Sequence, residues 1–258
     1  MIKIGIIGVG TVAQLMHLPI LDDLVDKFKV VAITDVSASQ MAAVAKKYNI
    51  ESTYASAEEL IEQADIDAVL VLSPDPYHGR NVAHALKHGK HVFVEKPATL
   101  CSQELNGLIE LHKDHPNQIA MVGYMRRYAA SFLKAKEILE KDPRKVEYLR
   151  FRDIILEGHY FINQTRPVSK PTDVPQHLID ENNQMRRDQV SLAIGEDATD
   201  AQRLSHRMLT GLGCHTFSAV RELFGVPKKI RSVVTYSGGE HMVIVMEFDG
   251  FLGVYEVV

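Results

Sequence analysis

Lys3-Ile4-Gly5-Ile6-Ile7-Gly8-Val9-Gly10-Thr11-Val12-Ala13 is the stretch that decides the fold. A β-branched run ends at glycines with the spacing G-x-G-x-x-A, and a helical pattern starts at Val12. In such a strand–turn–helix the first glycine permits a tight turn, the second lets a phosphate approach the backbone, and the alanine lets the helix pack closely. Unpaired N–H groups at the helix start attract phosphate. The stretch predicts a Rossmann unit that binds a dinucleotide.

Asp35 supports this interpretation from the end of the second predicted strand, 22 residues after Ala13. An acidic side chain at this place accepts hydrogen bonds from the adenosine ribose hydroxyls. Val36 and Ser37 follow it, so a 2′-phosphate would meet a carboxylate with no arginine beside it. The pattern favours NAD as the cofactor, with NADP less favoured. The alternative is an ordinary strand–turn–helix in which Asp35 only begins a turn.

Strand and helix signals alternate over the first 120 residues. Near-unbroken apolar strands between helices indicate an α/β, doubly wound parallel sheet covered on both faces. Pro19 should break or kink the first helix near Leu18. The predicted strands are Lys3–Val9, Lys29–Thr34, Thr53–Tyr54, Asp67–Leu72, His91–Glu95 and Gln118–Gly123, and the predicted helices are Val12–Leu24, Ser39–Tyr48, Ala57–Glu62, Gly79–His88 and Ser102–Lys113.

The pattern changes after Gly123, and we expect a Rossmann domain at 1–120 followed by an α+β domain at 121–258. The second domain should contain a mainly antiparallel sheet. Its polar segment 157–202 is typical of a functional loop, a lid or partial disorder, with one helix at His177–Ala193 ended by Gly195. The other predicted elements are helices Ser131–Lys141 and Arg203–Phe224, strand Lys145–Ile155, and the meander Lys229–Tyr236, His241–Phe248 and Phe251–Val258.

Composition excludes several functional classes. The chain has 258 residues, a formal net charge of −4 and a sequence pI near 6.3, which argue against a nucleic-acid or anionic-membrane binder. Its apolar runs are too short to span a membrane, and no signal peptide precedes the first strand. Cys101 and Cys214 suit a reducing, cytoplasmic setting. The twelve histidines form no H-x-x-x-H spacing joined to a carboxylate, so we expect no metal site.

Two polar clusters follow the fourth and fifth predicted strands, where ligands of parallel sheets bind. The first runs from Ser73-Pro74 to His78, and the second is Glu95-Lys96-Pro97. A lysine that ends a buried strand is unusual, because an unpaired buried ammonium is costly. Lys96 could stabilise a developing alkoxide beside a nicotinamide. Alternatively, its long side chain reaches solvent.

Four motifs together resemble one family. They are Gly8–Ala13 with His17-Leu18-Pro19, Ser73-Pro74 with His78, Gly89–Pro97, and Gly123–Tyr128, and Gly213-Cys214-His215 extends the likeness. The chain is similar to the glucose–fructose oxidoreductase / inositol dehydrogenase / rhizopine catabolism (Gfo/Idh/MocA) family.

This resemblance implies NAD(P)-dependent hydride transfer to or from a sugar, polyol or related hydroxy or keto compound. It implies that Lys96 and His215 are catalytic and that Arg126 contacts the substrate. The expected cofactor-binding residues are Gly8, Gly10, Thr11, Val12, Asp35, Ser73, Pro74, His78, Glu95 and Lys96.

The residues around His215 also allow this role. Gly211, Gly213 and Cys214 are small, so a ligand could approach, and an imidazole suits proton transfer near neutral pH. A structural helix histidine is the alternative. Tyr124 could bind the substrate and supply an alternative hydroxyl acid, and Arg127 is expected to pair with an acid. His159 and Tyr160 could also line the pocket.

The sequence departs from the family pattern at Gly211, where many relatives carry an aspartate four residues before the histidine. Relatives also continue beyond the strand in which this chain stops, so the second sheet should have an open edge that a homo-oligomer would cover. These departures keep open a rival function, a non-catalytic dinucleotide-binding sensor or regulator of the same fold.

Overall fold

The computed structural model describes residues 1–142, 145–154, 164–165 and 168–258, and it divides into two compact units. The first unit comprises Met1–Gly123 and Glu157–Ala193, and the second comprises Tyr124–Leu156 and Ile194–Val258. This division differs from the consecutive domains 1–120 and 121–258. The reason is that α8 (Gln176–Ile194) hydrogen-bonds to the loop after β4 and to α5 of the first unit. His159 and Tyr160 lie outside the described residues.

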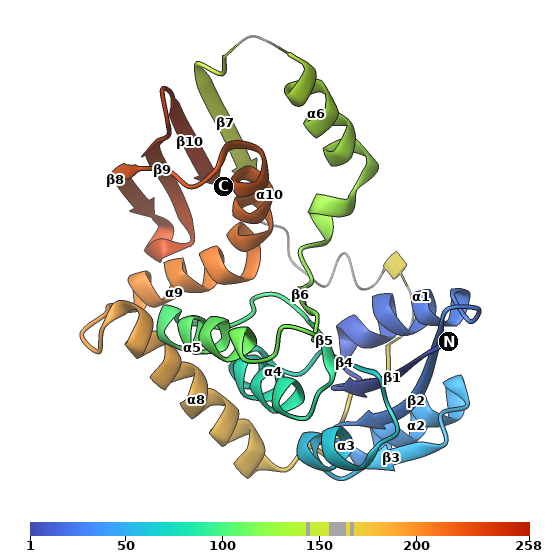
Figure 1. The fold of residues 1–258 in the computed structure, drawn as a ribbon. Helices are drawn as coiled ribbons and strands as arrows, with labels where there is room; N and C mark the ends of the chain where they lie inside the picture. The colour runs from blue at the N-terminus through green and yellow to red at the C-terminus, as the bar shows by residue number, and fades with distance from the viewer. Residues whose placement is uncertain (143–144, 155–163, 166–167) are drawn as a thin grey trace. The chain divides into compact units, whose positions relative to one another are not determined.

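The first unit contains the predicted α/β doubly wound sheet, with all its strands parallel and in the order β3-β2-β1-β4-β5-β6 (Figure 1). This order places the switch point between β1 and β4, where ligands bind in such sheets. The strands are β1 (Ile2–Ile7), β2 (Phe28–Thr34), β3 (Ser52–Tyr54), β4 (Ala68–Val71), β5 (His91–Val94) and β6 (Ala120–Val122).

Helices cover both faces of this sheet, and each face has its own apolar core. On one face α1 and α2 pack against β1 and β2 through Leu18 and Val44. On the other face α3, α4 and α5 pack through residues such as Leu60 and Leu86. The helices are α1 (Leu18–Asp23), α2 (Ala38–Tyr48), α3 (Ala57–Gln63), α4 (His78–Lys87) and α5 (Ser102–Lys113).

The helix after the glycine turn is not broken at Pro19, contrary to the sequence-based expectation. It opens as a π-turn, Ala13–His17, and continues as α1, with Pro19 in its first turn. The Leu18 N–H donates to the Ala13 carbonyl, which lies five residues back. Inside an α-helix the proline ring clashes with the carbonyl four residues back, and the wider π-turn before Pro19 relieves that clash. The π-turn therefore keeps the helix continuous across the proline.

The second unit is the predicted α+β unit with a mainly antiparallel sheet. Its strand order is β7-β10-β9-β8, in which β8, β9 and β10 form the expected meander and β7 pairs with β10 in parallel. Helix α10 packs on one face through Phe217 and Val220. The elements are α6 (Ala130–Lys141), β7 (Tyr148–Asp153), α9 (Asp200–Met208), α10 (Cys214–Phe224), β8 (Lys229–Tyr236), β9 (His241–Glu247) and β10 (Leu252–Val257).

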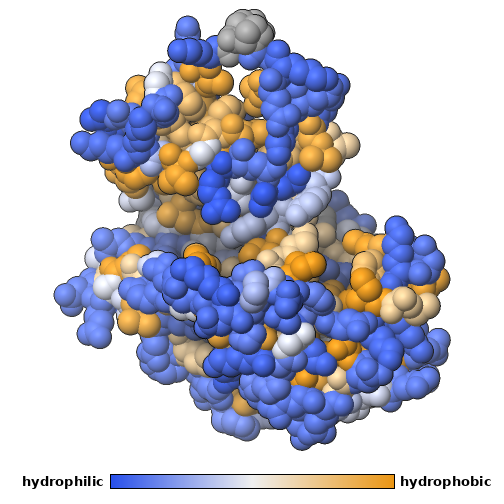
Figure 2. All heavy atoms as spheres, in the orientation of Figure 1, coloured by the Kyte–Doolittle hydropathy of each residue, from blue (hydrophilic) through white to orange (hydrophobic). Residues whose placement is uncertain are grey.

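Strand β8 is an exposed edge. All eight of its residues are exposed, including Ile230, Val233, Val234 and Tyr236. Figure 2 shows apolar side chains gathered on this unit. The last strand, β10, lies inside the sheet between β7 and β9, so the open edge is not where the chain stops. No helix in the described residues is long and apolar enough to cross a membrane.

Gly8 is the position where the turn after β1 excludes any other residue. Its φ is +90°, and a Cβ there would lie 2.8 Å from the backbone of Leu72 and Ser73. By contrast, a Cβ at Gly10 would meet nothing within 4 Å. The two glycines therefore serve different purposes: Gly8 permits the turn, and Gly10 leaves space beside it.

Gly8→Ala should lower the free energy of unfolding by about 1–3 kcal/mol, because alanine is strained at positive φ and its Cβ would clash with backbone. Chemical denaturation measures this. Gly10→Ala is the matched control and should change stability by less than about 0.5 kcal/mol. Equal losses in the two variants would contradict this account of the turn.

Candidate functional site

The glycine turn is tied to the end of β2 by hydrogen bonds. The Val9 N–H donates to Asp35 Oδ2 at 2.8 Å, and the Ser37 N–H donates to Asp35 Oδ1 at 2.9 Å. Asp35 is partly exposed, and each carboxylate oxygen can accept a further bond. The arrangement holds the Asp35 carboxylate beside the helix start; its binding to a ribose stays a prediction.

The helix start fits a pyrophosphate. The open space at Gly10 lets a ligand reach the backbone, and Thr11 and Val12 stand at the first helical positions with their side chains partly or fully exposed. Backbone N–H groups at such a start carry partial positive charge. The residues present therefore fit the dinucleotide that the motif implies.

Asp173 joins this site although nothing in the sequence pattern marks it. Its carboxylate accepts hydrogen bonds from the Ser37 hydroxyl at 2.5 Å, the Ser39 N–H at 2.9 Å and the Ser39 hydroxyl at 2.8 Å. The Ser37 hydroxyl, followed by the two groups of Ser39, lowers the pKa of Asp173 to about 2. The carboxylate is thus charged at neutral pH, and the contact would be lost only as the pH falls from about 4 toward 2.

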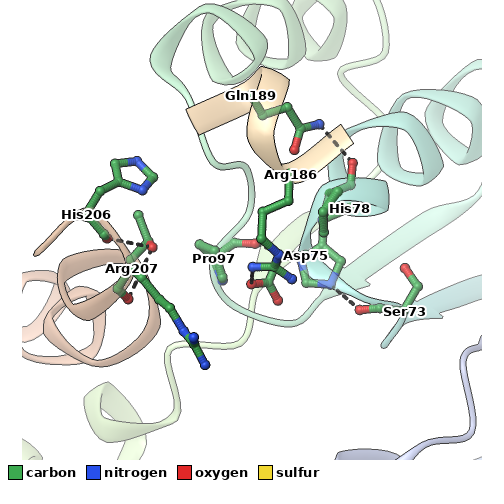
Figure 3. Close-up of polar contacts among 10 residues, drawn as sticks. Ser73, Asp75, His78, Pro97, Arg186, Gln189, His206 and Arg207 are labelled. Carbon is green, nitrogen blue, oxygen red and sulfur yellow. Dashed lines mark hydrogen bonds and ion pairs between the residues drawn. The ribbon is translucent and has the colours of Figure 1, made fainter. Parts of the chain in front are cut away.

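His78 lies between the two polar loops that follow β4 and β5. Its side chain is buried, with Nε2 at 2.7 Å from the Ser73 carbonyl and Nδ1 at 2.7 Å from the Pro97 carbonyl (Figure 3). Both ring nitrogens contact protein, so the expectation that His78 itself touches the cofactor does not fit its placement. We assign it a positioning role, in which it holds the Ser73-Pro74 turn against the Glu95-Lys96-Pro97 loop.

Helix α8 covers the same loop from the outside. Arg186 Nη1 lies 3.1 Å from Asp75 Oδ2, and the Gln189 amide donates to the Pro76 carbonyl at 2.9 Å (Figure 3). The predicted helix in the polar segment is therefore confirmed, and it braces the turn after β4. Gly195 follows α8 at a φ of +95°, as the prediction of a glycine end requires.

Glu95 and Lys96 directly follow β5 at the carboxyl edge of the sheet. Burial alone would raise the pKa of Glu95, but the His17 ring nitrogen at 2.8 Å and the Lys96 N–H outweigh it and lower the pKa. Glu95 is therefore a carboxylate at neutral pH. Lys96 is partly buried, which does not decide between a functional lysine and one whose side chain reaches solvent. Glu95 thus connects the fifth strand to the helix of the glycine turn through His17.

In the second unit, Arg126 belongs to a buried network around Asp153. Its Nη1 donates to Asp153 Oδ1 at 2.7 Å and to the Thr216 hydroxyl at 2.6 Å, and the Tyr255 hydroxyl donates to Asp153 Oδ2 at 2.9 Å. The Asp153 side chain is 3% exposed, and that of Arg126 is 40% exposed. Burial, and then the charge of Asp153, raise the pKa of Tyr255, so its hydroxyl remains a donor.

His215 is buried in the first turn of α10, directly after the π-turn Leu209–Gly213. A Cβ at Gly213 would lie 2.8 Å from the Tyr255 hydroxyl, whereas one at Gly211 would meet nothing within 4 Å. The predicted helix Arg203–Phe224 is therefore three segments, α9, the π-turn and α10. Gly213, which has no side chain, allows the close approach of Tyr255.

Tyr124 and Arg127 differ in what they can offer. Burial raises the pKa of the Tyr124 hydroxyl, which makes it a hydrogen-bond donor rather than a proton source at neutral pH. Arg127 pairs with Glu222, which Lys136 also contacts at 2.8 Å. The expected pairing of Arg127 with an acid is present within the second unit.

Three side chains of the first unit lie close enough together to bind a metal ion, which bears on the expectation that the chain has no metal site. Glu62, His84 and His88 place one ligand atom each within 4.8 Å of one another, on α3 and α4. His84 and His88 have the H-x-x-x-H spacing, and His84 Nε2 lies 2.9 Å from Glu62 Oε1. The expectation that no such spacing joins a carboxylate is wrong here. Two imidazoles and a carboxylate can hold Zn²⁺, although an ion pair accounts for the same contacts.

Removing the buried carboxylate should destabilise the protein. Asp153→Ala would leave Arg126, Thr216 and Tyr255 without their shared acceptor, so we expect the free energy of unfolding to fall by about 3 kcal/mol. Urea denaturation measures it. Glu256→Ala, which removes an acid that pairs with the exposed Arg150, should cost clearly less. A neutral Asp153→Ala variant would contradict the network.

In the comparison with known proteins, the family match falls almost entirely on the first unit. The Gfo/Idh/MocA model, an oxidoreductase family with an NAD-binding Rossmann fold, matches residues 2–124. Inositol 2-dehydrogenase/D-chiro-inositol 3-dehydrogenase of Shouchella clausii is 37% identical over 142 residues, which is 55% of this chain and 41% of that protein. Inositol 2-dehydrogenase 3 of Saccharopolyspora erythraea is 34% identical over 139 residues, 54% of this chain and 40% of that protein.

Solved structures share the fold over almost the whole chain. Myo-inositol 2-dehydrogenase from Lactobacillus plantarum has a TM-score of 0.74 and 23% identity, and the match covers 99% of this chain and 69% of that one. Scyllo-inositol dehydrogenase from Lactobacillus casei, solved with bound cofactor NAD(H) and scyllo-inositol, has a TM-score of 0.72, 20% identity and the same coverage. The chain spans about two fifths of the length of the curated relatives it matches. Residues 2–124 of this chain, the Rossmann unit that begins with the glycine turn, thus resemble the NAD-binding Rossmann fold of the Gfo/Idh/MocA family.

Proposed function

We propose that the protein is an NAD-dependent oxidoreductase that moves a hydride between the nicotinamide and a hydroxyl-bearing carbon of a polyol or sugar. The carrying observation is the glycine turn whose Val9 N–H holds the Asp35 carboxylate beside the helix start. The names of the similar proteins, inositol dehydrogenases, support a cyclic polyol as the substrate class.

The cofactor-binding roles follow from the first unit. Gly8, Gly10, Thr11 and Val12 would hold the pyrophosphate, and Asp35 would bind the ribose. Ser73 and Pro74, held by His78, would flank the bound nucleotide, and Glu95 would fix the loop that carries Lys96. When bound, the nicotinamide supplies the two-electron step by accepting or donating a hydride.

The chain's own residues would handle the proton and the substrate oxygen. In the oxidation direction the hydroxyl proton moves to a ring nitrogen of His215, and the carbon gives up its hydrogen with the bonding electrons. The Lys96 ammonium would hydrogen-bond a substrate oxygen and stabilise developing negative charge there. Arg126, partly exposed although it is bound to Asp153, and the Tyr124 hydroxyl would hydrogen-bond neighbouring hydroxyls of the substrate.

Partners and setting are part of the proposal. The exposed edge strand β8 supports a homo-oligomer that covers the second sheet. The net charge of −4 does not suit nucleic acid or an anionic membrane as a partner. In the described structure Cys101 and Cys214 are thiols, not disulfide-bonded, which supports a cytoplasmic location.

Two substitutions test the catalytic roles. Lys96→Ala and His215→Asn should each lower turnover of the best substrate in a polyol panel by about 10²–10⁴-fold. His215→Asn should leave the NADH dissociation constant within a few-fold of wild type, since His215 lies in the second unit. NADH fluorescence and absorbance at the nicotinamide band measure binding and turnover. Full activity in either variant would remove that residue from the mechanism.

Gly211 favours the second candidate, a dinucleotide-binding sensor that does not turn over substrate. The resemblance places an aspartate here, one turn before the histidine, and this chain has none. A Cβ at Gly211 would meet nothing within 4 Å, so the first atom of a side chain fits there.

Gly211→Asp therefore separates the two functions. If the protein is an enzyme, the added carboxylate should raise turnover by about tenfold by orienting His215 and assisting proton transfer. Gly211→Asn adds a similar volume without the charge and serves as the control. Wild type that binds NADH but turns over no compound in the panel, with no gain in Gly211→Asp, would favour the sensor.

A further inference from the structure

A short strap, defined as residues 169–173, crosses the nucleotide-binding loops. At one end the Ser169 N–H donates to Gln14 Oε1 at 3.0 Å, and Gln14 Nε2 donates back to the Ser169 carbonyl at 3.3 Å. Gln14 itself is buried beside the glycine turn and donates to the Val9 carbonyl at 2.9 Å. The strap is therefore anchored on the helix that would receive the pyrophosphate.

The other end of the strap carries the Asp173 carboxylate. It accepts from the Ser37 hydroxyl, the Ser39 N–H and the Ser39 hydroxyl, so it engages three donors at once. Ser37 is buried and its N–H binds Asp35, the carboxylate that would hold the adenosine ribose. The strap therefore places a second carboxylate directly after the ribose-binding one.

These donors are the kind that a phosphate monoester needs. A 2′-phosphate on the ribose would project from the sugar held by Asp35, toward hydroxyl and backbone N–H donors of the loop after β2. In this chain Asp173 already accepts from those donors. A phosphate would have to displace it or lie beside it, with like charges repelling one another. An unmodified ribose needs only Asp35, whose carboxylate accepts from the Val9 and Ser37 N–H groups.

We propose that Asp173 is a specificity-determining residue of the nucleotide site, which excludes NADP by holding the Ser37 and Ser39 donors that a 2′-phosphate would use. The inference rests on the proposed function, because it assumes that the site binds a nicotinamide dinucleotide. It assigns selectivity to a side chain that is 138 residues beyond Asp35, in a segment that the family match at 2–124 does not include.

Titration of NADH and NADPH fluorescence with wild type and Asp173→Ala tests this. The variant should bind NADPH about tenfold more tightly or better, while its dissociation constant for NADH changes less than about threefold. Asp188→Ala removes the same charge from an exposed site on α8, where the carboxylate accepts from the Gln184 amide at 2.7 Å, and should change neither constant. Thermal melting confirms that each variant is folded.

A double variant tests whether the donors of Ser39 account for the expected gain in NADPH binding. Adding Ser39→Ala to Asp173→Ala should take away much of the NADPH gain, because two of its freed donors belong to Ser39 and the hydroxyl would be lost. Unchanged NADPH binding in Asp173→Ala, with wild-type NADH binding intact, would overturn this inference and leave the proposed function standing. An equal gain in affinity for NADH and NADPH would also overturn the inference, because the strap would then hinder the binding of both cofactors without selecting between them. Wild type that binds neither cofactor would overturn the proposed function itself.

Discussion

The hydrogen bond from the Val9 N–H to Asp35 is the contact on which the rest of the first unit depends. It joins the turn after β1 to the end of β2, and the Gly8 N–H donates to the Thr34 carbonyl beside it. The turn can come this close only because Gly8 has no side chain and takes a positive φ. The glycine turn and the Asp35 carboxylate are thus held together by direct hydrogen bonds. The strap is bound to the loop that follows Asp35 through Asp173.

The two helices that carry the proposed chemistry share a local irregularity. A π-turn precedes α1 and ends at His17, and another precedes α10 and ends two residues before His215. Each has a cause in the sequence, Pro19 in the first case and a pair of glycines in the second. An added residue in a helical turn shifts the side chains that follow it, which is why such turns are frequent at functional sites. Here the His17 side chain, at the end of the π-turn, lies within hydrogen-bond distance of Glu95.

Periodicity in the sequence predicted nearly every strand and helix, because the apolar positions of a doubly wound sheet are set by its two cores. The glycine turn, Asp35 and the loops at Ser73 and Glu95 were found because their spacing is local. Asp173 could not be found this way: it lies in a polar segment without periodicity and meets its partners only in the folded chain. Asp153 was hidden for a different reason, since an acidic residue at the end of an alternating strand resembles a solvated one.

The Asp153 network also bears on the missing family aspartate at Gly211. Asp153 lies beside α10, since Thr216, the residue after His215, donates to it at 2.8 Å. Its two oxygens already accept from Arg126, Thr216 and Tyr255. A carboxylate whose two oxygens are occupied in this way holds the network together. Asp153 therefore anchors α10 and orients Arg126, and it does not replace the aspartate that relatives carry one turn before the histidine.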